Sequence, residues 1–333
     1  MKTDHHDIEE KKNRRQGVFF SHPEAQQNGV LVLYKPKGMS SAAALAVIKR
    51  GFTQKKIGHA GTLDPMAEGV LLALLGQATK LSGHLMGAGT KIYSGSILLG
   101  VETDTWDMEG EVVAQVAPEQ VFEQVTEEAV RAAMAELVGT YEQEVPAYSA
   151  AKHQGKPLYA LAREGLATPV KKKTVTIFSG QVESVDLPHV RFRVECSSGT
   201  YIRSLAHSLG KRLGCGAALE ILIREHSYPF GLERAVHLDE LEENPELFKQ
   251  KLCSIAEALP TWIRVVLTKT EAERAKNGNP VPFRKTDETS SFTAGESILL
   301  ELDDGTPVAL AETAVSQGEE VWAIVRGLWN KQG

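Results

Sequence analysis

One carboxylate, Asp64, stands in a glycine-rich turn (IGHAGTLDP, Ile57–Pro65) directly before a long apolar run. Short polar turns that bring one carboxylate to the mouth of a buried sheet are a recurring way to build a catalytic site. Backbone N–H groups in such a turn can stabilise the ionised carboxylate. Asp64 is therefore a candidate nucleophile or base. The alternative is an Asp that only closes its own turn through a local hydrogen bond.

A cation that could hold Asp64 ionised is Arg203, in the string SSGTYIRSLAHSLG. A guanidinium group that gives two parallel hydrogen bonds to a carboxylate both orients it and keeps it charged. Tyr201 lies two residues earlier, and both side chains can reach one cavity if the chain is still extended there. Without a link to Asp64, Arg203 would be an exposed helix charge and Tyr201 a core residue.

An enzyme that acts on a base in folded RNA needs further groups. It needs a surface that stacks the extruded base, a side chain that fills the vacated stack, and cations that hold the backbone. The segment PAYSAAKHQGKPLYALAREG offers Lys152 and Lys156 around Gly155, and three lysines follow at 171–173. We expect a flexible, donor-rich loop that orders on RNA. As a bare charge run it would be a solvated face.

Two other carboxylate patterns carry less chemistry. Asp64 and Glu68 could be the acid pair of a glycosidase, but a second carboxylate at helical spacing is weak support for one. Asp104 and Asp107, in TDTWDMEG, could suggest a metal site, but their spacing matches no EF-hand loop. We interpret this second pair as structural.

Composition indicates a soluble globular protein. The chain has 333 residues, 42% of them hydrophobic and 24% charged, which is enough for one large and one small domain. No apolar stretch is long enough to span a membrane, and the first residues lack the apolar core of a secretory signal. Three cysteines without C-x-x-C spacing favour reduced thiols in the cytoplasm and argue against a zinc ribbon.

The charge is unevenly distributed, although the net value of −6 does not suggest a nucleic-acid partner. Residues 101–145 hold twelve acidic side chains and one basic one, whereas residues 147–234 hold thirteen Lys and Arg against seven Asp and Glu. A basic lobe could meet phosphates while the acidic lobe stays solvated. Two solvated faces are the simpler alternative.

These residues need elements that position them. Residues 1–28, with His5 and His6, are predicted to be a flexible polar tail. We expect strands at 29–35, 93–101, 173–187, 189–197 and 218–224. Helices are predicted from Ser40 or Ser41 to Arg50, at 78–86, from Thr126 to near Gly139, and at 201–213. The apolar run 69–76 is compatible with either a strand or a helix. From about Thr261 the pattern becomes that of a small β-rich barrel.

Several ordered motifs between Gly29 and about Glu240 resemble the TruB family of tRNA pseudouridine synthases: LYKPKGMSS, GHAGTLDP, ATK, TDTWD, KHQGKPLY, SSGTYIR and LGCGA. The resemblance implies an α+β pseudouridine synthase fold, with a mixed, mainly antiparallel central sheet flanked by helices. It places a catalytic domain at 29–260, with an RNA-gripping thumb at about 141–173. The region 261–333 resembles a PUA-like RNA-binding β-barrel domain. Tyr34 departs from the family, which commonly has Asp there.

The resemblance also assigns roles. It implies that Asp64 is catalytic, as nucleophile or base, and that Tyr201 and Arg203 line its pocket. The residues that match substrate-binding positions of the family are Tyr93, which stacks on the target base, His59, which fills the space it leaves, Leu222, which packs on the flipped base, and Lys80.

The implied activity is isomerisation of uridine 55 in the T-arm of tRNA, without a cofactor or metal. We expect a monomer with no obligate protein partner. An RNA chaperone that refolds the T-arm is a second hypothesis. A relative that acts on another RNA, as its cousins in box H/ACA particles do, is a third.

Overall fold

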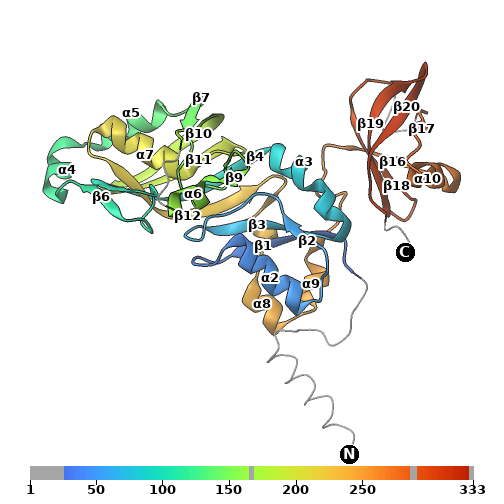
Figure 1. Cartoon of the computed structure of the whole chain (residues 1–333), viewed down its shortest axis with the longest axis horizontal. Helices are drawn as coiled ribbons and strands as arrows, with labels where there is room; N and C mark the ends of the chain where they lie inside the picture. The colour runs from blue at the N-terminus through green and yellow to red at the C-terminus, as the bar shows by residue number, and fades with distance from the viewer. Residues whose placement is uncertain (1–25, 165–168, 286–290, 330–333) are drawn as a thin grey trace, which may run out of the picture.

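The computed structural model describes residues 26–164, 169–285 and 291–329. Most of the predicted tail, with His5 and His6, therefore lies outside the described residues. Within them, one large mixed sheet carries helices at its two ends, and a smaller curled sheet follows at the C-terminal end (Figure 1). No helix in the described ranges is both long and apolar enough to cross a bilayer.

The large sheet has eleven strands, eight of them in the order β14-β1-β3-β12-β4-β11-β10-β7. Two strand pairs, β1–β14 and β3–β12, are parallel, and the other neighbours are antiparallel. The strands of this sheet are β1 (Gly29–Lys35), β2 (Ile57–His59), β3 (Glu68–Leu75), β4 (Thr90–Leu99), β7 (Gly139–Glu144), β10 (Lys172–Asp186), β11 (His189–Ser197), β12 (Ala217–Ser227), β13 (Phe230–Gly231), β14 (Val236–His237) and β15 (Leu252–Cys253).

Two small hairpins lie outside this sheet, and helices cover it. The hairpins are β5 (Val101–Thr103) with β6 (Val112–Gln115), and β8 (Lys152–His153) with β9 (Lys156–Pro157). The helices before the C-terminal unit are α2 (Ser41–Gly51), α3 (Ser82–Gly87), α4 (Pro118–Gln124), α5 (Glu127–Ala135), α6 (Leu158–Arg163), α7 (Ile202–Leu213), α8 (Leu238–Glu243) and α9 (Leu247–Gln250), with 3-10 turns η1 (Gly76–Leu81) and η2 (Leu232–Arg234).

The ambiguous apolar run is strand β3, and both of its faces are buried. Leu71, Ala73 and Leu75 belong to the main core under the helices, whereas Leu72 and Leu74 belong to a second core on the opposite face. A strand that is covered on both faces loses the alternation of apolar and polar residues. This is why the sequence pattern alone could not separate strand from helix here.

Helix ends follow the predicted local rules. Ser40 is the N-cap of α2, and its hydroxyl accepts a hydrogen bond from the amide of Ala43 at 3.1 Å. Thr126 caps α5 in the same way, although this helix ends at Ala135 and Gly139 already begins β7. Gly214 closes α7 in the left-handed region, with φ 74°. The predicted strand 93–101 begins at Thr90 and is divided at Gly100.

The C-terminal unit is a curled five-stranded sheet with one helix, set at the end of the molecule near α3 (Figure 1). Its apolar residues Leu299, Leu310 and Leu328 join the second core against β1 and β3. A hydrogen bond from Trp262 Nε1 to His84 Nε2, 3.0 Å long, connects its start to α3. The elements of this unit are β16 (Ile263–Val266), α10 (Lys269–Lys276), β17 (Val281–Pro282), β18 (Ser297–Glu301), β19 (Pro307–Ser316) and β20 (Glu319–Gly327).

Candidate active site

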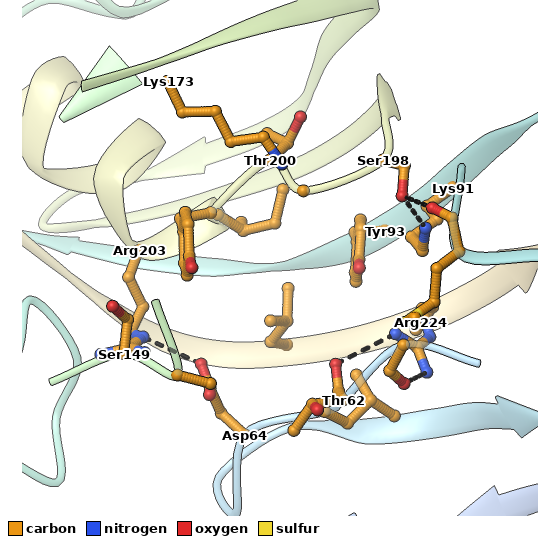
Figure 2. A pocket seen from close by; sticks show the side chains of 18 residues that line it. Thr62, Asp64, Lys91, Tyr93, Ser149, Lys173, Ser198, Thr200, Arg203 and Arg224 are labelled. Atoms are coloured by element: carbon orange, nitrogen blue, oxygen red, sulfur yellow. Dashed lines mark hydrogen bonds and ion pairs between the residues drawn. The ribbon is translucent and has the colours of Figure 1, made fainter. Parts of the chain in front are cut away.

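A cavity of about 350 Å³ opens where β4 and β12 pass the loop between β2 and β3. Its walls also include residues 198–203, which form the turn before α7 and the first residues of that helix, and the segment at 149–150. This volume is in the range of pockets that take one small ligand group. Asp64, Tyr93, Tyr201, Arg203 and Leu222 all line it (Figure 2), so the tertiary structure brings together these five residues, which the sequence spreads over 159 positions.

Asp64 and Arg203 form the ion pair that the sequence analysis predicted, but with different geometry. Arg203 Nε donates to Asp64 Oδ2 at 2.9 Å, and this is a single bond rather than the predicted bidentate pair. The side chain of Arg203 is 4% exposed, whereas that of Asp64 is 39% exposed. Asp64 Oδ1 has no hydrogen-bond partner among the described residues. One carboxylate oxygen is thus fixed and the other remains available to a ligand.

The two terminal nitrogens of Arg203 explain why the pair is not bidentate. Nη1 donates to the carbonyl of Thr105 at 3.0 Å, and Nη2 donates to the carbonyl of Tyr148 at 3.0 Å. The carboxylate of Asp107 lies 3.5 Å from Nε. A buried guanidinium needs such acceptors on all sides. They fix the plane of Arg203, which in turn fixes the direction from which Nε meets Asp64.

Tyr201 and Arg203 share the cavity because the chain is extended up to the start of α7. Tyr201 is the N-cap residue, with φ −99° and ψ 113°. Gln143 on β7 binds both backbone polar groups of Tyr201. Gln143 Oε1 accepts from the amide of Tyr201 at 2.8 Å, and Gln143 Nε2 donates to its carbonyl at 3.1 Å. The chain is therefore extended at Tyr201, as the prediction that Tyr201 and Arg203 reach one cavity required.

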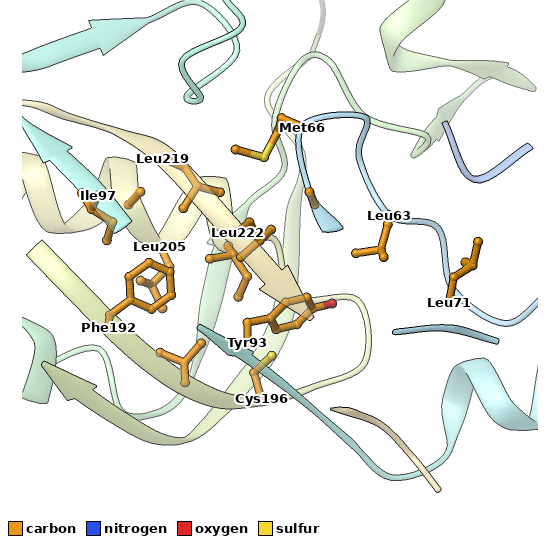
Figure 3. Close-up of a cluster of buried hydrophobic side chains, with 14 of the residues drawn as sticks. Leu63, Met66, Leu71, Tyr93, Ile97, Phe192, Cys196, Leu205, Leu219 and Leu222 are labelled. Carbon is orange, nitrogen blue, oxygen red and sulfur yellow. The ribbon is translucent and has the colours of Figure 1, made fainter. Parts of the chain in front are cut away.

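Tyr93 and Leu222 form an apolar wall at the edge of the main core (Figure 3). They come from adjacent antiparallel strands, in which Leu222 pairs with Gly95 and Arg224 pairs with Tyr93. A Cβ at position 95 would overlap the carbonyl oxygen of Ile221, so glycine is required for the close approach. Burial raises the pKa of the Tyr93 phenol, and the nearby Arg224 guanidinium opposes that rise. Tyr93 is therefore neutral near pH 7 and offers a flat apolar face.

The end of the cavity away from Asp64 and Arg203 is cationic (Figure 2). Arg224 is 1% exposed, and its three guanidinium nitrogens donate to the carbonyls of Val70, Thr62 and Gly61. Lys91 is 6% exposed, and its ammonium donates to Ser198 Oγ at 2.9 Å. Burial, together with the Arg224 charge, lowers the pKa of Lys91 to about 8. The cavity thus has a carboxylate at one end and buried cations at the other.

The chain is similar to known proteins over most of its length. Residues 49–202 match the family described as "TruB family pseudouridylate synthase (N terminal domain)". A protein named tRNA pseudouridine synthase B from Oleidesulfovibrio alaskensis is 54% identical over 92% of this chain and 98% of its own length. The chain belongs to the TruB family of pseudouridine synthases. It is therefore an isomerase. A second relative of that name, from Syntrophotalea carbinolica, is 40% identical over 88% of this chain and 94% of its own.

Solved structures support the fold of this pseudouridine synthase. The archaeal box H/ACA sRNP Nop10-Cbf5 complex contains a chain that is 24% identical and superposes with a TM-score of 0.66, covering 92% of this chain and 88% of the other. At that identity the likeness concerns the fold alone. It confirms the predicted α+β pseudouridine synthase fold with a PUA-like C-terminal domain.

Other predicted binding residues of this synthase lie outside the cavity lining. His59 ends β2, and burial, together with the Arg224 charge, lowers its pKa. Lys80, on η1, donates to the carbonyl of Gly327 at 2.5 Å and so connects to the C-terminal sheet. Lys152 and Lys156 lie on the hairpin β8–β9 beyond the cavity, and Lys156 is exposed. Their contacts with RNA stay predictions.

The carboxylates of the TDTWDMEG loop are engaged within the protein. Asp107 Oδ1 accepts from Thr105 Oγ1 at 2.7 Å and from the amide of Glu109 at 3.1 Å. Asp104 Oδ1 accepts from the amide of Glu111 at 2.8 Å. Within the described ranges no cluster of three His, Cys, Asp or Glu side chains could hold a metal ion. These hydrogen bonds within the loop stabilise its conformation. The loop also contacts Arg203 through the Asp107 carboxylate and the Thr105 carbonyl.

Sequence reasoning missed Lys91, Arg224 and the second contact of Arg203 with Asp107. A signal existed for the first two. Lys91 is two residues before Tyr93, and Arg224 is two residues after Leu222, so on a strand each shares a face with its predicted neighbour. The Asp107 contact had no such signal, because it depends on how a loop from β5–β6 docks on β12 and α7.

Proposed function

We propose that this synthase converts uridine 55 in the T-arm of tRNA to pseudouridine, with Asp64 as the nucleophile or base. In this isomerisation the bond between N1 and C1′ breaks, the base turns, and C5 bonds to C1′. The proton on C5 leaves, and N1 gains one. One observation carries the proposal: a cavity of single-nucleotide size contains one carboxylate with a bound and an available oxygen.

The geometry supports a different role for each side chain around the cavity. Arg203 orients the Asp64 carboxylate through the 2.9 Å bond. Tyr93 and Leu222 lie on the apolar wall, where they would hold the extruded base between them. Tyr201 places a phenol in the same cavity, from which it could relay a proton. His59 would fill the space that the base leaves in the RNA.

The substrate is inferred from the relatives. Proteins named tRNA pseudouridine synthase B match nearly the whole chain, including the region after residue 260. We expect the specificity of this enzyme to come from the shape of the T-loop more than from its base sequence. We assign catalysis to residues 29–260, RNA gripping to about 141–173, and added RNA contacts to residues 261–333. We expect the enzyme to work in the cytoplasm and as a monomer.

Tritium release tests this proposal directly. A T-arm stem-loop carrying tritium at C5 of the target uridine is incubated with the wild-type protein and with the Asp64→Asn variant, and RNA affinity is measured in parallel. We expect release with the wild type, none with the variant, and affinities within a few-fold. No release from the wild type with intact binding would instead favour the chaperone hypothesis or another RNA. A large loss of affinity in the variant would make Asp64 structural.

A further inference from the structure

The cationic end of the cavity is not used by the chemistry assigned above. Lys91 and Arg224 are buried there, and Lys173 reaches the same cavity from β10. In the described part of the chain, none of the three has a carboxylate within ion-pair distance. Burying positive charge without a counter-charge costs free energy. Such a cluster at a ligand cavity indicates that the ligand brings the negative charge.

The arrangement of Lys91 is that of a site rather than of a surface lysine. Its ammonium lies on the cavity side of β4, with Ser198 Oγ as its one hydrogen-bond partner among the described residues. An ammonium carries three donors, so two remain. Burial and the neighbouring charges of Arg224 and Lys173 lower its pKa to about 8. A bound anion would accept hydrogen bonds from the two remaining donors of Lys91. It would also offset the repulsion between Lys91 and the charges of Arg224 and Lys173.

Figure 2 separates the two ends of the cavity. Lys91, Ser198 and Arg224 lie together on the side away from Asp64 and Arg203, with Tyr93 beside them. A nucleotide has the matching polarity, because its base is neutral and its phosphate is negative. The Asp64 carboxylate repels a phosphate, whereas the three cations attract it. The charge separation therefore fixes which way round a nucleotide lies in the cavity.

We propose that Lys91, backed by Arg224 and Lys173, binds the phosphodiester group next to the target uridine and so orients the sugar toward Asp64. This inference rests on the proposed function, since it supposes that the ligand is RNA. Lys91 makes the direct contact, because Arg224 already gives its nitrogens to three carbonyls. Lys173 is the exposed member and adds long-range attraction.

A mutant cycle between protein and RNA tests the contact. Stem-loops carry a neutral methylphosphonate in place of the phosphate on the 5′ or the 3′ side of the target uridine, and a third carries it deep in the stem. Affinities are measured for proteins with and without Lys91→Met, all in the Asp64→Asn background so that no turnover intervenes. Lys172→Met removes an equal charge from an exposed residue outside the cavity lining and is the matched control.

We expect Lys91→Met and one of the two flanking replacements each to weaken binding by about tenfold to 150-fold, the range for a charge-assisted hydrogen bond. Combined, they should cost no more than either alone, whereas Lys172→Met should combine independently with the same replacement. Lys91→Arg should restore affinity for the natural stem-loop. If the Lys91→Met variant does not fold, the proposal is tested by two remaining measurements. These are the affinity of Lys91→Arg and the effect of each methylphosphonate on binding to the protein that keeps Lys91.

Two results would overturn the assignment. One is that the losses from Lys91→Met and from both flanking replacements multiply. The other is that inorganic phosphate competes for Lys91 while the methylphosphonates have no effect, which would identify a site for a free anion. Failure of the proposed function is distinguishable, because it appears as absent tritium release from the wild type even when the binding cycle shows coupling.

Discussion

Arg203→Lys is the substitution that most directly tests how the site is held. It keeps the positive charge but replaces three separated nitrogens by one. In the structure these nitrogens serve Asp64, Thr105 and Tyr148 at 2.9, 3.0 and 3.0 Å. A single ammonium cannot occupy all three positions. The variant therefore keeps the charge and loses the orientation.

The expected loss of rate can be worked out from the bonds. A hydrogen bond that involves a charged group contributes about 1.5–3 kcal/mol. Losing the one that orients Asp64 should slow the chemical step by about tenfold to 150-fold, since each 1.36 kcal/mol is a factor of about ten. The carbonyls of Thr105 and Tyr148 also lose their donors, which should lower the free energy of unfolding by about 2–4 kcal/mol.

Single-turnover tritium release at saturating enzyme measures the chemical step, and urea denaturation measures stability. Arg193→Lys is the matched control, because the side chain of Arg193, on β11, is 42% exposed and makes one bond to Glu225 at 2.8 Å. It should change stability by less than about 1 kcal/mol and leave the rate unaltered. If Arg203→Lys released tritium within twofold of the wild-type rate, Arg203 would not be what orients Asp64.

Three further predictions concern other parts of the structure. Tyr93→Leu should slow single-turnover tritium release by about fivefold to 150-fold through lost stacking of 1–3 kcal/mol, and unchanged kinetics would remove Tyr93 from the base-binding wall. Gly69→Ala should lower the free energy of unfolding by about 2–4 kcal/mol in urea melts, because φ is 101° and a Cβ would overlap the Arg224 carbonyl; a change below 0.5 kcal/mol would contradict this. Burial, and secondarily the Lys211 charge, lowers the pKa of His207 in the folded protein below 6.5. The unfolded chain therefore binds this proton more readily, and stability is lost as the pH falls from the unfolded pKa toward the folded one. His207→Phe keeps the stacking on Trp106 and removes a buried Nδ1 that has no hydrogen-bond partner among the described residues. Its Tm should therefore fall less between pH 7.5 and 5.5 than that of the wild type, and equal losses would refute this role of His207.

Local sequence was sufficient wherever one segment carries the whole signal. The cap of α2, the Gly214 stop of α7 and the paired strands β10 and β11 depend on neighbouring residues only. Each was predicted, although the cap could be assigned only to Ser40 or Ser41. The Asp64 turn and the GTYIR string are likewise continuous, so the central catalytic candidates could be named in advance. Their pairing was also predicted, because a carboxylate in a dry pocket needs a cation.

Tertiary structure decided what depends on the pairing of distant strands. Whether residues 69–76 form a helix or a strand was settled by cores on both faces, which no periodicity within the segment reveals. The single Arg203–Asp64 bond follows from carbonyls of Thr105 and Tyr148, which approach from two different loops. The cationic end of the cavity exists because β4 and β12 align Lys91 and Arg224 on one face. Residue types and spacing thus determined which groups could act, and the strand register determined which of them meet and in what orientation.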